Sequence, residues 1–311
     1  MYGTWIAGEG RQPRGKKRMK RVLLLGATGM LGSAVYGVLR KKHDLVLGVR
    51  SVDKVALLEK AYGGTGRHQV LPFEALLIYQ DYAAKKGFRG DYMAEFLRRV
   101  GEVDYVINAV GVTIPFALRE PAVTFFINGA LPHLLAREFG ERLIHITTDC
   151  VYNGREGFPY KENSPKSPVD LYGLSKSIGE PAGCLTIRTS IIGRELYGFS
   201  GLLEWFLQQH GNTITGFAEH YWNGVTTQQF GKLCDQIMES PADFPRSGVY
   251  HVFSTVVSKY EMLLAFQRKY RVACTIKADV ENKLNRTMAT IKEMNGLLKV
   301  PSFPEMLDAL D

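Results

Sequence analysis

Residues 22–32 read VLLLGATGMLG, an apolar run followed by three glycines spaced three residues apart. The run Val22–Leu25 predicts a short buried strand, and Leu31, Val35 and Val38 then recur at helical spacing. A strand, a glycine turn and a helix in this order are the context that a dinucleotide-binding motif requires. The stretch therefore predicts a βα unit that binds a pyrophosphate.

Each glycine of this motif has its own use in such a turn. Gly26 permits the tight bend, Gly29 lets the backbone approach the pyrophosphate, and Gly32 lets the helix pack closely on the strand. We therefore expect cofactor contacts along the whole turn, from Gly26, Thr28, Gly29, Met30, Leu31 and Gly32.

The end of the second strand, expected at 45–49, indicates which dinucleotide is bound. Enzymes that use NAD usually carry an acid here for the ribose hydroxyls, whereas an arginine accommodates the additional phosphate of NADP. This chain has Arg50 at that position, and Asp53 further on is expected to begin the next helix. The sequence thus favours NADPH, with NADH as the alternative.

Strand and helix patterns alternate along the rest of the chain. Apolar runs predict strands at 68–71, 103–108, 143–146, 184–188 and 248–253, and helical patterns lie at 92–100 and 125–139. This alternation predicts an α/β fold, a Rossmann-type doubly wound parallel sheet with a smaller C-terminal substrate-binding lobe.

The predicted elements divide the chain into two main parts. We expect an NADP-binding domain at 19–188, completed by segments within about 225–255, and a region at 189–311 that is mainly substrate-binding lobe. A short strand is expected at 213–215 in that lobe. Residues 79–90 read as an insertion.

The composition and the cysteine spacing lead us to expect a cytoplasmic enzyme. It is 45% hydrophobic but has no apolar run near the roughly 20 residues of a membrane span, and its four cysteines lack metal or disulfide spacing. The net charge of +8 arises mostly at 1–21, where seven basic residues face one acid. Residues 1–18 are therefore expected to be a disordered basic leader, a solvated tail rather than a nucleic-acid-binding arm.

Small and polar residues follow two of the predicted strands. Asn108, Ala109 and Val110 close the strand at 103–108, where small side chains would let a cofactor ribose lie against the backbone; a plain turn is the alternative. Thr148 follows the strand at 143–146, and its hydroxyl could hydrogen-bond a substrate carbonyl. Both groups are expected at the carboxyl edge of the sheet, where such folds bind ligands.

Tyr172 and Lys176 lie four residues apart and would share one face of a helix that starts near Asp170. An ammonium beside a phenol favours the phenolate and lowers the pKa of the tyrosine. Such a tyrosine can exchange a proton with a carbonyl oxygen while a hydride moves at the adjoining carbon. An ordinary amphipathic helix is the alternative for this pair taken alone.

Together these motifs resemble the extended short-chain dehydrogenase/reductase superfamily. The stretches TTDCVYNG at 147–154, PYKE at 159–162, YGLSK at 172–176 and Gly179-Glu180 are more closely similar to the dTDP-4-dehydrorhamnose reductase group. The resemblance implies NADPH-dependent reduction of a nucleotide-linked 4-keto-deoxysugar, in deoxysugar and surface polysaccharide biosynthesis. Tyr172 would donate the proton, Lys176 would hold the nicotinamide ribose, and Thr148 would orient the ketone.

The resemblance also suggests residues and partners around this site. Substrate contacts are expected from Asp149, Arg188, Asn223, Thr226 and Arg286, although packing roles are equally compatible with the last four. No metal, nucleic-acid or membrane partner is expected. A homodimer is implied, although Pro181 and the insertion at 79–90 depart from the group's usual layout.

Cys150 leaves a second activity open. Sugar-nucleotide dehydratases carry Asp-Glu after the catalytic threonine, so Asp149-Cys150 disfavours dehydration. A cysteine here resembles the GDP-fucose synthase arrangement, which implies a bifunctional epimerase/reductase with Cys150 as base; a small buried hydrophobe is the alternative. Two non-catalytic alternatives share the scaffold: a regulatory subunit of the methionine adenosyltransferase partner type and an NADP-binding redox sensor.

Overall fold

The computed structural model describes residues 19–87 and 89–310. The basic leader expected at 1–18 lies outside the described residues. Among the described helices, none is long and apolar enough to cross a membrane.

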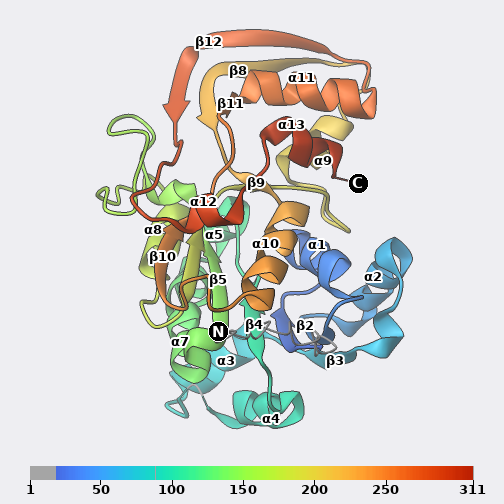
Figure 1. The fold of residues 1–311 in the computed structure, drawn as a ribbon, viewed down its shortest axis with the longest axis vertical. Helices are drawn as coiled ribbons and strands as arrows, with labels where there is room; N and C mark the ends of the chain where they lie inside the picture. The colour runs from blue at the N-terminus through green and yellow to red at the C-terminus, as the bar shows by residue number, and fades with distance from the viewer. Residues whose placement is uncertain (1–18, 88, 311) are drawn as a thin grey trace, which may run out of the picture.

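A seven-stranded parallel sheet forms the centre of the molecule (Figure 1). The strand order is β10-β6-β5-β4-β1-β2-β3. The bounds are β1 (Arg21–Leu25), β2 (Asp44–Val49), β3 (Gln69–Pro72), β4 (Tyr105–Asn108), β5 (Leu143–Thr147), β6 (Leu185–Arg188) and β10 (Gly248–His251). Because β1 lies between β2 and β4, the order reverses there, and the turns after β1 and β4 open into the crevice where doubly wound sheets bind ligands. The predicted Rossmann-type fold is confirmed, as is the return of the late strand to the main sheet beside β6.

Helices cover both faces of the sheet because its strands are apolar on both sides. One apolar core joins the sheet to α1 (Met30–Leu39), α2 (Val55–Tyr62), α10 (Thr227–Glu239) and α12 (Met294–Leu298). A second core joins the other face to α3 (Ala75–Ala83), α4 (Asp91–Val100) and α7 (Leu131–Phe139).

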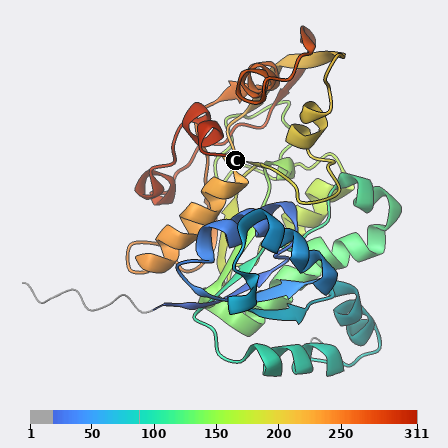
Figure 2. The ribbon, with the colours of Figure 1, turned by 90° about the vertical axis from the view of Figure 1, so that its right-hand side faces the viewer.

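A smaller lobe stands at one end of the sheet, at the top of Figures 1 and 2. Its three-stranded sheet has the order β11-β8-β12, with bounds β8 (Thr213–Trp222), β11 (Val257–Ser258) and β12 (Thr275–Asn285). The helices α9 (Leu202–Leu207), α11 (Lys259–Tyr270) and α13 (Phe303–Asp308) share its apolar core. Two short strands, β7 (Ile191–Ile192) and β9 (Val225–Thr226), pair with each other. In sequence, β7 lies between β6 and α9, and β9 lies between β8 and α10. The boundary near residue 188 between the NADP-binding domain and the substrate-binding lobe remains a proposal.

Several local predictions need correction. The segment 79–90 is not wholly an insertion, because its first residues belong to α3 and a turn then leads into α4. The helix expected at 125–139 begins earlier, with α6 (Pro121–Thr124), and includes a π-helical turn at Phe125–Ala130 before α7; the helix α5 (Ile114–Arg119) precedes it. The strand expected at 213–215 continues to Trp222, because β12 pairs along it.

The glycine turn after β1 is closely packed. Gly26 has a φ of +79°, which favours glycine, and a Cβ added at Gly32 would lie 2.1 Å from the Gly26 carbonyl oxygen. The start of α1 can therefore approach β1 only with glycine at position 32.

We expect Gly32→Ala to lower the free energy of unfolding by about 1–3 kcal/mol, because backbone must shift to admit the methyl group. Denaturant titration measures this change. Gly66→Ala is the control, since an added Cβ there meets nothing within 4 Å. Equal stability of the two variants would contradict the close approach.

Candidate active site

A cavity of about 380 Å³ opens at the carboxyl ends of the strands. Its walls come from the glycine turn, the segment after β4, the end of β5, and α8 (Leu171–Ile178). Residues expected to bind cofactor and residues expected to react line the same cavity; they include Met30, Ala109, Thr148, Asp149, Tyr172 and Lys176. The structure thus brings together segments that lie far apart in sequence.

A helix cap fixes the start of α8, the helix that lines this cavity with Tyr172 and Lys176. The Asp170 carboxylate caps the helix by accepting a hydrogen bond from the Gly173 amide at 2.7 Å. Tyr172 and Lys176 then lie one turn apart on the same face, and both line the cavity together with Thr148. The Thr148 hydroxyl itself donates to the Asp149 carboxylate at 3.0 Å. The predicted trio therefore lines one cavity.

The pKa of Tyr172 moves in the direction opposite to our expectation. Burial raises this pKa, the nearby Cys150 and Asp149 raise it further, and the Thr148 hydroxyl only partly opposes them. Lys176, which was expected to lower this pKa, is not among the main effects on it. Tyr172 is consequently a phenol at neutral pH, with a proton to donate.

Burial also acts on the second member of the pair. It lowers the pKa of Lys176 to about 8, and the Glu180 carboxylate opposes this shift. Lys176 has room to reach the cavity because Gly111 has no side chain; a Cβ there would lie 2.9 Å from the lysine Nζ.

Asn128 is a buried support that the sequence analysis did not assign to the site. It lies in the π-helical turn, a feature often found at functional sites. Its side chain accepts from the Val112 amide and donates to the Val112 carbonyl, both at 3.0 Å, and also donates to Ser175 Oγ at 3.2 Å. The residue thereby joins the cavity wall after β4 to α8. In the sequence, a lone polar residue within the largely apolar helical stretch FFINGA was the signal that could have indicated its role.

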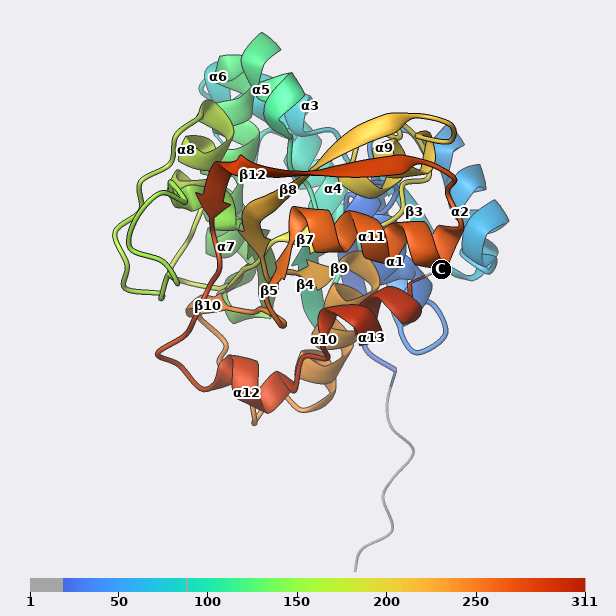
Figure 3. The ribbon, with the colours of Figure 1, turned by 90° about the horizontal axis from the view of Figure 1, so that it is seen from above.

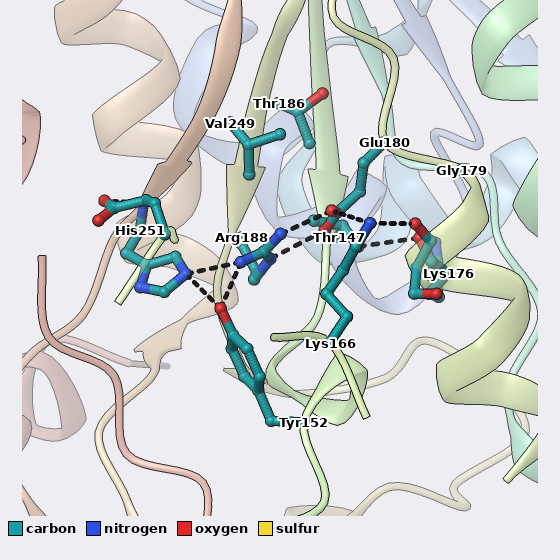
Figure 4. A network of polar contacts seen from close by, with 12 residues as sticks. Thr147, Tyr152, Lys166, Lys176, Gly179, Glu180, Thr186, Arg188, Val249 and His251 are labelled. Carbon is teal, nitrogen blue, oxygen red and sulfur yellow. Dashed lines mark hydrogen bonds and ion pairs between the residues drawn. The ribbon is translucent and has the colours of Figure 1, made fainter. Parts of the chain in front are cut away.

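Figure 4 shows the buried ion pair of Arg188 and Glu180, to the left of Lys176 in this view. The Arg188 guanidinium donates to both Glu180 oxygens, at 2.8 and 2.6 Å, and both side chains are 3% exposed. Burial opposes the charge on Arg188, but the Glu180 carboxylate holds the pKa of Arg188 above its ordinary value. Lys166 also contacts Glu180, at 3.1 Å.

Two further side chains complete this network. Arg188 donates to the Tyr152 hydroxyl, and its Nη1 lies 2.9 Å from Nε2 of His251. Because Nδ1 of His251 lies 2.7 Å from the Ala289 carbonyl, which can only accept, Nδ1 carries the proton and Nε2 accepts. The network thus links β6, β10 and the turn after Thr148.

Three expected substrate ligands have other partners in the structure. Arg188 is occupied by the buried network, and Asn223 exchanges two hydrogen bonds with the Met288 backbone, at 2.8 and 3.0 Å. Thr226 caps α10 by accepting from the Gln229 amide. None of them lines the cavity, so their positions favour the packing alternative. Arg286, in contrast, lies beside the site, with its Nη1 3.5 Å from the Cys150 sulfur.

Cys150 lines the cavity as a thiol. Burial raises the pKa of Cys150 to about 12, Asp149 adds to this effect, and Arg286 only partly opposes it. A proton-abstracting base would have to be a thiolate. The environment of Cys150 therefore disfavours the epimerase alternative.

A second groove of about 180 Å³ continues from the cavity toward the end of β2. Both share Gly29, Ala109 and Val110, and the groove reaches Gly26, Thr28 and the exposed Arg50. This continuous hollow fits an extended dinucleotide, with a glycine cradle at its middle and a cation at one end. Two expected contacts line neither part of this hollow: Asn108 is buried and accepts from the Val110 amide, and Gly32 packs against the Gly26 carbonyl.

Sequence comparison finds one matching family model, described as the RmlD substrate binding domain, over residues 19–290. A spore coat polysaccharide biosynthesis protein SpsK of Bacillus subtilis is 28% identical over 53% of this chain and 61% of its own length. A dTDP-4-dehydrorhamnose reductase of Burkholderia thailandensis is 29% identical over 49% of this chain and 56% of its own length. Methionine adenosyltransferase 2 subunit beta of Xenopus tropicalis is 25% identical over 79% and 71%. The chain thus spans less than two thirds of the first and second of these relatives.

Solved structures show the same fold. A dTDP-4-dehydrorhamnose reductase of Bacillus anthracis in complex with NADP has a TM-score of 0.67 at 18% identity, over 94% of this chain and 99% of the other. A hypothetical dTDP-4-dehydrorhamnose reductase of Sulfolobus tokodaii has a TM-score of 0.65 at 20% identity, over 91% and 97%.

We expect Glu180→Gln to lower the free energy of unfolding by about 3 kcal/mol or more, because it leaves the buried Arg188 charge without its partner. Denaturant titration by circular dichroism measures the change. Glu95→Gln is the control, since Glu95 and Arg98 form an exposed pair, and it should leave stability nearly unchanged. A small, equal effect in both variants would refute the importance of the buried pair.

Proposed function

The chain belongs to the RmlD substrate binding domain family, and on that premise we propose that it is an NADPH-dependent reductase of a nucleotide-linked 4-keto-deoxysugar. The observation that carries the proposal is the meeting of Thr148, Tyr172 and Lys176 in one cavity that continues into a dinucleotide-shaped groove. The names of the reductase relatives support the substrate class, and the NADP bound in the Bacillus anthracis structure supports the cofactor. Such reductases serve deoxysugar and surface polysaccharide synthesis, which the name of the Bacillus subtilis relative also supports.

The groove would hold the cofactor through the backbone of the glycine turn and through Arg50. The turn offers amide groups at the N-terminus of α1, where the helix dipole favours a pyrophosphate. The Arg50 guanidinium suits the additional phosphate of NADP. When bound, the nicotinamide supplies a hydride to the carbonyl carbon.

The protein's own contribution is the proton and its position. Tyr172 carries its proton at neutral pH because burial raises its pKa, so it can donate to the carbonyl oxygen as that oxygen becomes an alkoxide. The Lys176 ammonium stabilises the negative charge left on the phenol, and the Thr148 hydroxyl orients the ketone. The raised pKa thus favours the direction of ketone reduction.

A regulatory subunit is the second candidate. The similarity to methionine adenosyltransferase 2 subunit beta, over 79% of this chain, favours it. A regulatory role does not require the three polar side chains to meet at the cavity. Measured NADPH consumption with keto-sugar nucleotides supports the reductase, whereas tight co-purification with a larger enzyme and no turnover supports the subunit.

We expect Tyr172→Phe to lower kcat by about 10²–10⁴-fold while leaving the affinity for NADPH unchanged, because the phenol supplies only the proton. NADPH consumption with dTDP-4-keto-6-deoxysugar, together with cofactor fluorescence titration, separates the two effects. Tyr82→Phe, at a tyrosine that is 50% exposed, is the control. Full activity of Tyr172→Phe would remove this residue from the mechanism.

The pH dependence of kcat/KM should report on Lys176. The protonated form is the active one, and the pKa of Lys176 lies at about 8, so kcat/KM should fall as the pH rises through that value. In Lys176→Arg the guanidinium stays charged, so any residual activity should lose this alkaline limb. An alkaline limb that stays in place in that variant would assign it to another group.

A further inference from the structure

A second cavity, of about 460 Å³, opens between α1 and α10, apart from the active site. These two helices pack against each other on one face of the main sheet (Figure 3). None of the residues that line this cavity lines the cavity that contains Tyr172 or the groove that reaches Arg50. Within the described part of the chain, no carboxylate lines it. The basic residues among its lining are Arg40, Lys42, Arg194 and Lys232.

Contacts within the protein hold both arginine side chains in place and leave their ends free. Arg40 donates from Nε to the Tyr62 carbonyl at 2.9 Å and from Nη1 to the Gly37 carbonyl. Arg194 donates from Nε to the Glu204 carboxylate at 2.7 Å. Within residues 19–87 and 89–310, Nη2 of Arg40 and both Nη atoms of Arg194 have no hydrogen-bond acceptor. A guanidinium that is fixed at Nε and open at its end suits the oxygens of a phosphate.

The positive charge of this cavity is only partly balanced. Lys42 and Arg194 each form an ion pair with a carboxylate outside the lining. Among the residues that the structure describes, Arg40 and Lys232 have no acidic partner. Cations that gather in a hollow without acids attract anions. The cavity therefore has the charge of an anion-binding site.

A buried hydroxyl in the wall is a separate indication that a ligand belongs here. Thr227 lines the cavity and is 1% exposed, and its Oγ1 has no hydrogen-bond partner among the described residues. Such hydroxyls are rare in proteins, because a buried donor without an acceptor costs free energy. Thr227 is also the first residue of the 13-residue helix α10, whose first amides lack intrahelical acceptors and whose dipole favours an anion. An anion in the cavity would supply acceptors for these donors.

We propose that the cavity between α1 and α10 binds a small molecule that carries a phosphate or diphosphate group, at a site separate from the cofactor and substrate sites. The two guanidiniums and the Thr227 hydroxyl donate to the phosphate oxygens, and Lys232 adds a charge at the exposed side. Val38 and Leu310 form an apolar part of the wall, which suits the carbon skeleton of an organic phosphate. The inference does not rest on the reductase activity, because the site shares no residue with the cavity of Tyr172.

The test is calorimetric titration of inorganic pyrophosphate and of AMP into the full chain in saturating NADP⁺, so that the groove beside Arg50 is not open to either probe. Arg40→Gln should weaken binding of the probes about tenfold, because it removes a charge-assisted hydrogen bond. Lys232→Gln should weaken it about threefold, since this ammonium is exposed. Arg99→Gln and Lys60→Gln, at exposed residues of α4 and α2, are the matched controls and should change nothing.

Each outcome decides the proposal. It is overturned if neither probe binds the wild type, or if both probes bind Arg40→Gln and Lys232→Gln as tightly as the wild type, which would place them elsewhere on the protein. Tighter binding of AMP than of pyrophosphate would identify an organic phosphate as the ligand, and the reverse order would identify an inorganic one. Thermal unfolding and NADP⁺ affinity of each variant establish that the protein is folded and that the cofactor groove is intact.

Discussion

The close approach of α8 to the rest of the domain is the constraint on which the active site depends. A Cβ at Gly173 would lie 2.2 Å from the Cys150 carbonyl oxygen, and one at Gly179 would lie 1.8 Å from the Asn128 carbonyl oxygen. Both ends of the helix therefore touch backbone that only glycine can approach. Held in this way, α8 presents Tyr172 to Thr148 and sets Lys176 against the wall after β4.

Burial then determines the chemistry of the side chains that α8 carries. The same desolvation that keeps Tyr172 protonated lowers the pKa of Lys176 to about 8, so the site offers a proton donor beside a cation that still retains most of its charge near neutrality. Glu180, one turn beyond Lys176, limits the loss of charge. Its own negative charge is kept by Arg188. Arg188 thus keeps Glu180 charged, and Glu180 helps to keep Lys176 charged, on the same helix face as Tyr172.

The sequence predicts well what short segments determine alone. The apolar run Val22–Leu25, the glycines after it and the spacing of Tyr172 and Lys176 are local patterns, and the fold class and the meeting of the trio follow from them. The sequence does not show which buried polar side chains already have hydrogen-bond or ion-pair partners within the protein. The resemblance made Arg188 a candidate substrate contact, with a packing role as the alternative, and the Glu180 carboxylate eight residues earlier is its partner in the structure. Asn128 belongs to no motif, and its partners Val112 and Ser175 come from distant segments, so only the tertiary structure reveals its role.

The network behind α8 has a consequence for how the chain folds during synthesis. Its last member, His251, follows Arg188 by 63 residues and arrives with β10, the edge strand beside β6. While the ribosome makes the segment between β6 and β10, β6 is an open edge, and the Glu180–Arg188 pair lacks the histidine and the strand that later cover it. Open edges of this kind attract other chains. We therefore expect chaperones to matter most to this protein in the interval after β6 has been synthesised and before β10 has.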